Sequence, residues 1–321
     1  MSFAVSVIIP VYNADQFIEK AIDSALMFTE VNEVVVINDG STDSSLELLL
    51  KLQEKDARIK IYHHKGAVNR GRSASRNLGI LQAKSDYISF LDADDFYLEQ
   101  RFNRDKLLLR NQHIDGVYNA VGFHLYRGIS DTEYHHFKVA TLSQIIPPEV
   151  LFENIVSSRL GYLHLNGLTV KRRAFDIVGF FNEELIVAED SDLIFKMALR
   201  MRLVPGYLQK EVSKRGVHIT NIFTNDALYE DYNLRLYESL ITWSLRYGIQ
   251  KEKIALLLDT LWIHRYRQKA SILTYVIYWM QLQKKWPQLM VTRLFLKYFP
   301  LVRLRQRLFP IIFKKGYQIN D

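Results

Sequence analysis

Three aspartates stand within four positions at the end of a strand-like segment. Residues Tyr87–Leu91 are mostly apolar and of strand length, and Asp92, Asp94 and Asp95 follow them directly. Carboxylates this close repel one another and lose hydration on burial, so the cluster is costly unless a cation offsets its charge. Mg²⁺ and Mn²⁺ take oxygen ligands and are often held by one or two carboxylates together with a substrate's phosphates. The Asp-x-Asp stretch therefore predicts a divalent-cation site, and the alternative is a solvated acidic turn or a helix N-terminus.

Length and composition bound the class of protein. The 321 residues can bury one large core or two smaller ones, and 48% of them are hydrophobic. The absence of cysteine excludes disulfide scaffolds, thiolate metal sites and cysteine nucleophiles. We expect no signal peptide, because the first apolar run is too short, and no apolar stretch reaches the roughly 20 residues that span a bilayer.

The net charge of +7 is unevenly distributed along the chain. From Asp226 onward there are 16 Lys and Arg against 7 Asp and Glu, whereas the preceding 225 residues hold 26 against 28. The basic character therefore belongs to the last hundred residues. Such a region can bind anionic lipid, nucleic acid or an acidic partner.

Strand-like and helix-like segments alternate over the first hundred residues. The predicted strands are Ala4–Ile9, Glu33–Ile37, Ile59–Tyr62 and Tyr87–Leu91, and the predicted helices are Asp15–Phe28, Ser44–Glu54 and Ser73–Ala83. This alternation is typical of a parallel sheet covered by helices, in which ligands bind beyond the carboxyl ends of the strands. Pro10–Asn13, Asn38–Gly40 and Asp92–Asp94 each follow a strand, so we expect them along one rim.

The second half shows a weaker pattern and then a helical one. Short β-like pieces run from about Gly116 to Val139, and the stretch Gly116–Pro148 carries no motif. The segments that follow are a helix at Glu149–Val156, a strand at Gly167–Val170, a short helix at Ala174–Gly179 and an amphipathic helix at Ser191–Met201. After Asn221 the pattern is almost wholly helical.

Five stretches in this order resemble the family 2 glycosyltransferases, enzymes of the GT-A nucleotide-sugar fold. They are Val7–Asn13, Val36–Asp43, Asn69–Gly71 with Arg76–Gly79, Leu91–Asp95 and Glu189–Leu193. The resemblance covers about residues 4–220. It implies an α/β fold of GT-A type, with a Rossmann-like, mostly parallel sheet flanked by helices and a helical C-terminal region after it. The implied domains are a catalytic domain at 1–221, with a nucleotide-sugar-binding half at 1–115 and an acceptor-side half at 116–221, and a basic, aromatic-rich helical region at 222–321.

The resemblance assigns four residues to the nucleotide-sugar. Pro10 and Tyr12 match positions that cradle the nucleotide base, and Tyr12 offers an aromatic face for it. Asp39 matches the carboxylate that recognises the base, and Arg76 matches a basic residue near the base and diphosphate. The alternatives are a tyrosine closing a core strand, a turn aspartate before glycine and a solvated helix charge.

The same resemblance assigns a metal site. Asp94 coordinates the cation directly, Asp92 serves the ribose or the metal, and His218 completes the metal or diphosphate contacts. Asp95 either supports these ligands from behind or starts the next helix. A structural histidine is the alternative for His218. Other histidines lack such a context and are interpreted as surface residues: His63, His64, His135 and His136.

The catalytic base is assigned to the second acidic pair. By resemblance, Asp190 accepts the proton of an acceptor hydroxyl as its oxygen attacks the anomeric carbon, and Glu189 orients the acceptor or the base. One displacement with one base inverts the anomeric configuration. The alternative is a pair of acidic residues favoured at the start of the Ser191–Met201 helix, and Asp192 is interpreted only as helix-start charge.

The last hundred residues mix basic side chains with large apolar ones. The uncharged segment Ala270–Gln283 is too short to span a bilayer. Basic residues follow it among Leu, Phe and Tyr: Lys284, Lys285, Arg293, Lys297, Arg303, Arg305, Arg307, Lys314 and Lys315. This pattern suits helices lying in an anionic membrane interface. The alternative is a subdomain packed on the catalytic domain or on a second copy, as a homo-oligomer; nucleic-acid binding is disfavoured because no binding motif accompanies the charge.

Together these features predict a metal-dependent, inverting glycosyltransferase that uses Mn²⁺ or Mg²⁺. The favoured donor is a UDP-sugar, and the acceptor is a hydroxyl of a glycan or lipid-linked molecule, as in polysaccharide biosynthesis. The expected location is cytoplasmic, peripheral on the inner face of the cell membrane. A sugar-phosphate nucleotidyltransferase would carry a Gly-rich phosphate loop near the first strand, which the Pro10–Tyr12 stretch lacks. The remaining alternative is a catalytically idle nucleotide-sugar-binding or membrane scaffold protein.

Overall fold

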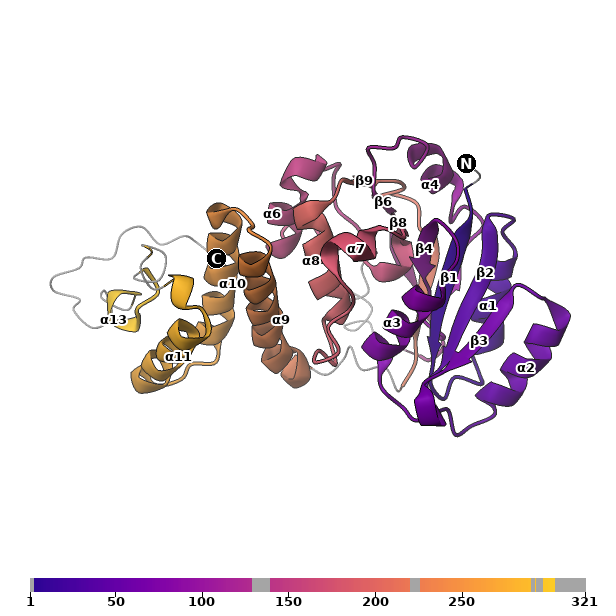
Figure 1. Ribbon diagram of the computed structural model, residues 1–321, viewed down its shortest axis with the longest axis horizontal. Coiled ribbons are helices and arrows are strands. Elements are labelled where there is room, and N and C mark those ends of the chain that lie inside the picture. The colour runs from indigo at the N-terminus through magenta and orange to yellow at the C-terminus, as the bar shows by residue number, and fades with distance from the viewer. Residues whose placement is uncertain (1–2, 129–138, 220–225, 290–291, 293–296, 304–321) are drawn as a thin grey trace. The chain divides into compact units, whose positions relative to one another are not determined.

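The computed structural model describes residues 3–128, 139–219, 226–289, 292 and 297–303. The chain divides into two units, Met1–Leu236 and Tyr237–Asp321 (Figure 1). The domain boundary expected at residue 221, and the histidines at 135 and 136, lie outside the described residues.

The first unit contains most of the strands and helices expected from the sequence. Its first half comprises β1 (Val5–Val11), α1 (Ile18–Leu26), β2 (Val31–Asn38), α2 (Ser45–Lys55), β3 (Ile59–His63), η1 (Lys65–Ala67), α3 (Arg72–Gln82), β4 (Tyr87–Phe90), β5 (Phe96–Tyr97) and α4 (Asn103–Leu108). Its second half comprises β6 (Gly116–Tyr118), β7 (Val121–Leu125), η2 (Pro148–Val150), α6 (Leu151–Val156), η3 (Leu165–Gly167), β8 (Leu168–Lys171), α7 (Ala174–Val178), α8 (Glu189–Arg200), β9 (Leu203–Pro205) and β10 (Ser213–Val217).

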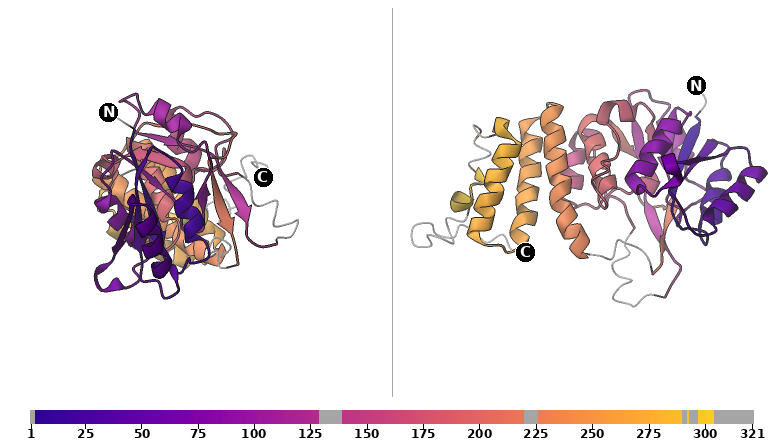
Figure 2. Two further views of the ribbon diagram at one scale, coloured as in Figure 1. Left: turned by 90° about the vertical axis from the view of Figure 1, so that its right-hand side faces the viewer. Right: turned by 60° about the horizontal axis from the view of Figure 1, so that its bottom comes forward.

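Seven strands form the main sheet in the order β3-β2-β1-β4-β8-β6-β9 (Figures 1 and 2). Neighbouring strands are parallel except at β8, which runs antiparallel to both β4 and β6. The central strands β1 and β2 are buried along nearly their whole length, as expected for strands covered by helices on both faces. The predicted mostly parallel sheet flanked by helices is confirmed.

The two faces of β1 are covered by different helices. Alternate residues such as Val7 and Ile9 pack with the buried sides of α1 and α2 in one apolar core. Helix α3 lies against the other face, where a Cβ on Gly79 would stand 2.4 Å from Cγ2 of Ile8. Glycine at this position therefore lets α3 approach the sheet closely, and α3 is the helix that carries Arg76.

The structure corrects two boundaries that bear on the site. Strand β1 continues through Pro10 to Val11 instead of stopping before the proline. Strand β4 pairs with β1 only over Val5–Ile8, so Pro10 has just β2 beside it, and its missing N–H breaks little of the ladder. Helix α8 begins at Glu189, two residues before the expected Ser191, because Ala188 adopts a left-handed conformation with φ 63° and turns the chain into the helix.

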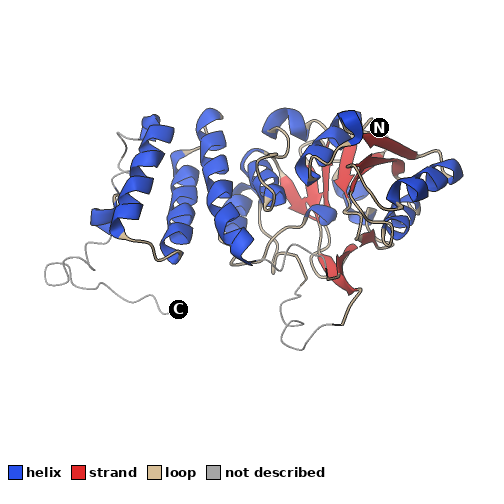
Figure 3. Ribbon diagram, turned by 90° about the horizontal axis from the view of Figure 1, so that it is seen from below, coloured by secondary structure: helices blue, strands red, loops and turns tan. Residues whose placement is uncertain are grey.

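A second, three-stranded sheet has the order β5-β10-β7 (Figure 3). Strand β5 directly follows the Asp92–Asp95 loop, and Lys214 of β10 pairs with Phe96 of β5. His218 stands just after the end of β10. The small sheet therefore brings residue 218 back to the loop that carries the three aspartates.

The second unit is helical in its described part. Helix α9 (Asp226–Arg246) enters it, and α10 (Lys251–Arg267), α11 (Ile272–Lys285), η5 (Pro287–Leu289) and α13 (Pro300–Arg303) follow. Its interior includes Trp262, stacked on Tyr298 with ring centres 6.2 Å apart, and Trp286, whose indole N–H donates to Thr242 at 3.0 Å. Among the described residues no helix has the length and apolar character needed to cross a membrane.

Candidate active site

The loops after β1 and β2 are tied together by Asn13. Its side-chain Oδ1 accepts the backbone N–H of Thr42 at 2.8 Å, and its own N–H donates to Ser41 at 3.1 Å. Asn13 has φ 50°, a left-handed conformation that asparagine tolerates better than most residues. Beside it, Pro10 is buried in β1, while Tyr12 is 51% exposed. Tyr12 therefore presents its ring at the open rim, and its contact with a nucleotide base stays a prediction.

Asp39, at the end of β2, holds the loop that leads into α3. Its two carboxylate oxygens accept the backbone N–H groups of Arg70 and Gly71 at 2.7 and 2.8 Å. His64 Nε2 lies 3.5 Å from the same carboxylate and 3.0 Å from Ser75 Oγ. His64 is thus part-buried in this network, which corrects its interpretation as a surface residue. The observed contacts give Asp39 a positioning role; its predicted recognition of the base stays a prediction.

Arg76 joins the two acidic stretches that the sequence separates by about a hundred residues. It is 2% exposed; its Nη2 donates to Asp92 at 2.6 Å, and its Nη1 donates to Glu189 at 2.8 Å. Arg72, one turn earlier on α3, reaches Glu189 at 3.3 Å. One guanidinium therefore fixes the end of β4 against the start of α8, a pairing geometry for which arginine is better suited than lysine.

Burial and neighbouring charges shift the pKa values of the three groups in this bridge in different ways. Burial alone would raise the pKa of Asp92, but the positive charges of Arg76 and Arg72 outweigh it and lower the pKa to about 2. Glu189 is 2% exposed, and burial raises its pKa despite the same two arginines. Burial would lower the pKa of Arg76, yet Asp92 and Glu189 raise it above the ordinary value. Asp92 and Arg76 therefore stay charged at neutral pH.

Asp94 and His218 meet across the two sheets. Asp94 Oδ2 lies 2.8 Å from His218 Nε2, and their side chains are 27% and 16% exposed. Phe17, just before α1, stacks on the histidine ring with centres 4.9 Å apart. Among the described residues no cluster of three or more His, Cys, Asp or Glu has the arrangement of a metal site. Two ligands of this kind still fit a Mg²⁺ or Mn²⁺ ion that takes its remaining ligands from phosphates and water.

Asp95 connects three segments behind these ligands. It is 4% exposed, its Oδ1 accepts the N–H of Gly216 at 2.7 Å, and its Oδ2 accepts the side-chain amide of Asn166. Burial, with the nearby charges of Asp94 and Asp92, raises its pKa well above the ordinary value. Asp95 therefore joins the β4 loop to η3 and β10, and it does not start a helix.

Asp190 lies in the first turn of α8, partly exposed, next to the Arg76 bridge. Its Oδ1 accepts the N–H of Ser191 at 2.7 Å, and its Oδ2 accepts no hydrogen bond from the part of the chain that the structure describes. A carboxylate oxygen without a donor at a helix start can take up a proton from a bound hydroxyl. Two residues on, Asp192 lies in the first turn of α8, as expected, and it is also fully buried and paired with Lys196.

Three further residues share this environment, and none of them belongs to a motif recognised in the sequence: Tyr162, His164 and Arg215. The buried ring of His164 lies within electrostatic range of Arg215, Asp190, Asp92 and Arg76, in that order of effect. Tyr162 interacts through its hydroxyl with Arg215, and the negative charge of Asp190 acts to raise the pKa of this hydroxyl. The available signals were weak: Arg215 stands three residues before His218, and His164 shortly precedes a strand-like segment.

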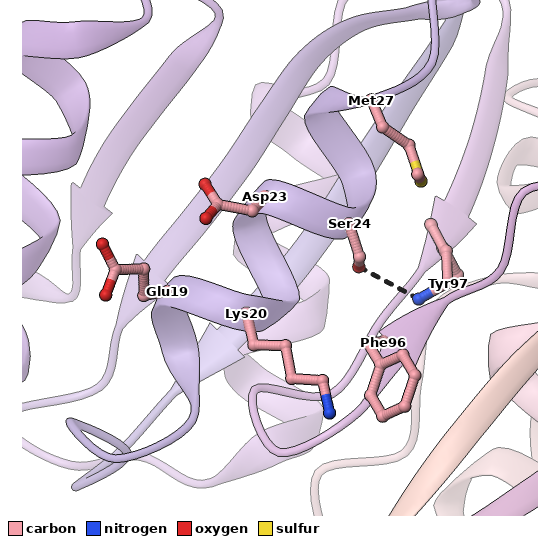
Figure 4. A pocket seen from close by; sticks show the side chains of 7 residues that line it. All are labelled: Glu19, Lys20, Asp23, Ser24, Met27, Phe96 and Tyr97. Atoms are coloured by element: carbon pink, nitrogen blue, oxygen red, sulfur yellow. Dashed lines mark hydrogen bonds between the residues drawn. The ribbon is translucent and has the colours of Figure 1, made fainter.

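A separate pocket of about 500 Å³ lies along the outer side of α1 and β5 (Figure 4). Lys20 Nζ lies 3.6 Å from the centre of the Phe96 ring, and the N–H of Tyr97 donates to Ser24 at 3.0 Å. None of the site residues expected from the sequence lines this pocket. The acidic residues and Arg76 therefore define the candidate active site independently of it.

Comparison with known protein families gives a match over half of the chain. The family described as Glycosyl transferase family 2 matches residues 6–168. An uncharacterized glycosyltransferase of Haemophilus influenzae is 34% identical over 143 residues, 44% of this chain and 54% of the relative. An uncharacterized glycosyltransferase of Rickettsia typhi is 31% identical over 252 residues, 78% of this chain and 74% of the relative. The chain thus spans only about half the length of the first of these relatives.

Two solved structures share the fold. Residues 1–349 of S. aureus TarS in complex with UDP-GlcNAc superpose with a TM-score of 0.62 at 19% identity, covering 94% of this chain and 81% of that one. The mannosyltransferase PcManGT from Pyrobaculum calidifontis, in complex with GDP-Man and Mn²⁺, gives a TM-score of 0.52 at 15% identity over 95% and 87% of the two chains. The expected GT-A type of fold is therefore confirmed, and by the family match and the Rickettsia relative the chain belongs to glycosyltransferase family 2.

Proposed function

We propose that this chain is a metal-dependent glycosyltransferase that transfers a sugar from a nucleoside diphosphate to a hydroxyl group with inversion at the anomeric carbon. The observation that carries the proposal is the Arg76 bridge, which sets Asp92 at the end of β4 beside Glu189 and Asp190 at the start of α8. The cation-binding side of the site and a carboxylate with a free oxygen therefore face the same region. This is the arrangement that a single displacement needs.

The reaction follows from these roles. The acceptor oxygen forms a bond to the anomeric carbon, the bond from that carbon to the diphosphate oxygen breaks, and its electrons leave with the nucleotide. Asp190 takes the proton of the attacking hydroxyl through Oδ2. Glu189, held by Arg72 and Arg76, keeps the start of α8 in place, so it acts as a positioning residue.

Asp94 and His218 would hold the cation, with Asp92 beside them. When bound, a divalent ion offsets the charge that develops on the departing diphosphate. Arg76 keeps Asp92 ionised, and Phe17 fixes the plane of the His218 ring. A UDP-sugar is the proposed donor; the UDP-GlcNAc complex of TarS supports it, as the Mn²⁺ complex of PcManGT supports the metal.

Replacing Asp94 tests the proposed metal site. We expect Asp94→Ala to weaken Mn²⁺-dependent binding of UDP by about 100-fold, because one of two protein ligands is lost. The measurement is titration calorimetry with UDP, with and without Mn²⁺. Glu183→Gln, at an exposed carboxylate outside the proposed ligands, is the control and should bind like the wild type. Equal UDP affinity of wild type and Asp94→Ala in Mn²⁺ would contradict this role.

We propose further that the second unit binds the cytoplasmic face of an anionic membrane, where a lipid-linked acceptor would be met. Helix α11 has no acidic residue and exposes Leu273, Ile277 and Met280 at helical spacing, followed by Lys284. An apolar stripe next to basic side chains is typical of interfacial helices. Packing on a second copy of the chain is the alternative.

Charged substitutions on α11 test the membrane proposal. We expect Leu273→Asp with Ile277→Asp to lower binding of the full chain to vesicles containing anionic lipid by about tenfold or more, because two apolar side chains no longer enter the interface. Vesicle co-sedimentation measures it. Leu107→Asp, on an exposed leucine of α4, is the control. Unchanged vesicle binding, together with dissociation of an oligomer, would favour the alternative.

A further inference from the structure

The ring of His164 is buried, and charged residues from both acidic stretches of the candidate site act on it. It is 6% exposed and stands just before η3. The charges of Asp190 and Asp92 both act on it, although these residues belong to opposite sides of the proposed reaction. In a single displacement the transferred sugar lies between the diphosphate and the base. Asn166 hydrogen-bonds both the ring of His164 and Asp95, so the ring also lies next to the loop that carries Asp92 and Asp94.

A backbone hydrogen bond fixes which ring nitrogen of His164 carries the proton. The N–H of Asn166 donates to Nδ1 of His164 at 3.3 Å. Nδ1 must therefore present its lone pair, so the neutral ring carries its proton on Nε2. Burial and the charge of Arg215 lower the pKa of His164 to about 3, against the opposing effect of Asp190 and Asp92. At neutral pH the ring offers one hydrogen-bond donor, Nε2–H.

The ring is also held in place. Asn166, which donates to it, binds Asp95 through its side-chain amide, and Asp95 in turn accepts the N–H of Gly216. Among the described residues, Nε2 of His164 has no hydrogen-bond partner. A donor that the described protein residues leave without an acceptor is able to donate to a bound molecule.

We propose that His164 contacts the substrate, with its Nε2–H donating a hydrogen bond to a hydroxyl oxygen of the transferred sugar. This inference rests on the proposed glycosyltransferase function. It adds a residue that recognises the transferred sugar and not the nucleotide. A site built to hydrogen-bond a substrate hydroxyl discriminates strongly against a ligand that lacks it.

Two substitutions separate the roles of the two ring nitrogens. Asparagine at 164 offers an oxygen near the Nδ1 position, which can still accept the N–H of Asn166, but it has no donor at the Nε2 position. Glutamine at 164 places an amide N–H near the Nε2 position. We expect His164→Asn to weaken binding of the preferred UDP-sugar about tenfold and to leave UDP itself unchanged, and His164→Gln to restore part of the loss. Titrations of the full chain with Mn²⁺ and UDP, UDP-glucose, UDP-galactose or UDP-GlcNAc measure this.

The outcomes distinguish this inference from the proposed function. Equal weakening of UDP and UDP-sugar by His164→Asn, or no weakening of either, overturns the role of His164 while the effect of Asp94→Ala on UDP still stands. A wild-type chain that binds none of the UDP-sugars differently from UDP overturns both. Independently, ¹⁵N NMR of the imidazole at pH 7, assigned by the signal lost in His164→Gln, should show the neutral ring protonated on Nε2. A ring protonated on Nδ1 or on both nitrogens contradicts the proposal.

Discussion

Asp190→Asn is expected to lower the turnover number for sugar transfer by about 10³-fold while UDP binding stays within twofold of the wild type. The loss is of the size that a positioned general base contributes, and asparagine keeps the shape of the side chain and its hydrogen bond from Ser191 but cannot take up the proton. Initial rates at saturating donor, measured as release of UDP, give the turnover number. Titration calorimetry with UDP and Mn²⁺ gives the affinity.

The matched control for Asp190→Asn is Glu184→Gln, the same change on an exposed carboxylate in the loop before α8. It should leave both turnover and affinity unchanged. Near-normal turnover of Asp190→Asn would mean that the base is another group. A variant that loses UDP binding in parallel with turnover would instead indicate that Asp190 holds the nucleotide side of the site together.

Arg76→Met is expected to have the largest effect on stability, lowering the free energy of unfolding by about 3–5 kcal/mol. Methionine fills a similar volume but leaves Glu189 buried without its closest cation and removes the main partner of Asp92. Removal of one member of a buried ion pair is costly for this reason, whereas exposed pairs contribute little. Denaturant unfolding monitored by circular dichroism measures the change.

Arg72→Met is the control for this change, because Arg72 is 42% exposed and touches the same glutamate. Its loss should cost less than about 1 kcal/mol. Glu189→Gln in the Arg76→Met background should recover part of the stability, since it removes the uncompensated charge. Equal destabilisation by the two arginine substitutions would show that burial of the Arg76 bridge is not the source of its contribution.

The sequence predicted the strands and helices around the sheet well. It predicted the hydrogen bonds and ion pairs between the site residues poorly. Apolar runs and amphipathic helices follow from local periodicity, so β1 to β4 and α1 to α3 were placed within a few residues. Pro10 was the exception. A proline is tolerated inside β1 only because β4 no longer pairs with β1 at this position, and the pairing pattern cannot be seen in the local sequence. Such information is tertiary and does not exist in a local pattern.

The motif residues were found because five stretches stand in the order seen in the family, although each stretch alone has a structural alternative. What Asp39 and Arg76 bind could not be predicted. Asp39 uses its oxygens on backbone amides of its own chain, and Arg76 is buried between two carboxylates, one of them distant in sequence. His164, a single histidine with no spacing signal, becomes noticeable only when the charges around it are known.

The reversed direction of β8 has a consequence for how this active site can diversify. The residues proposed to bind the nucleotide follow the parallel strands, whereas His164, the proposed sugar contact, precedes the antiparallel strand β8. The residues proposed to bind the nucleotide and His164 therefore belong to separate stretches of the chain. A different side chain at position 164 in related enzymes would then change which sugar is preferred, while the residues proposed to hold the cation and the diphosphate stay the same.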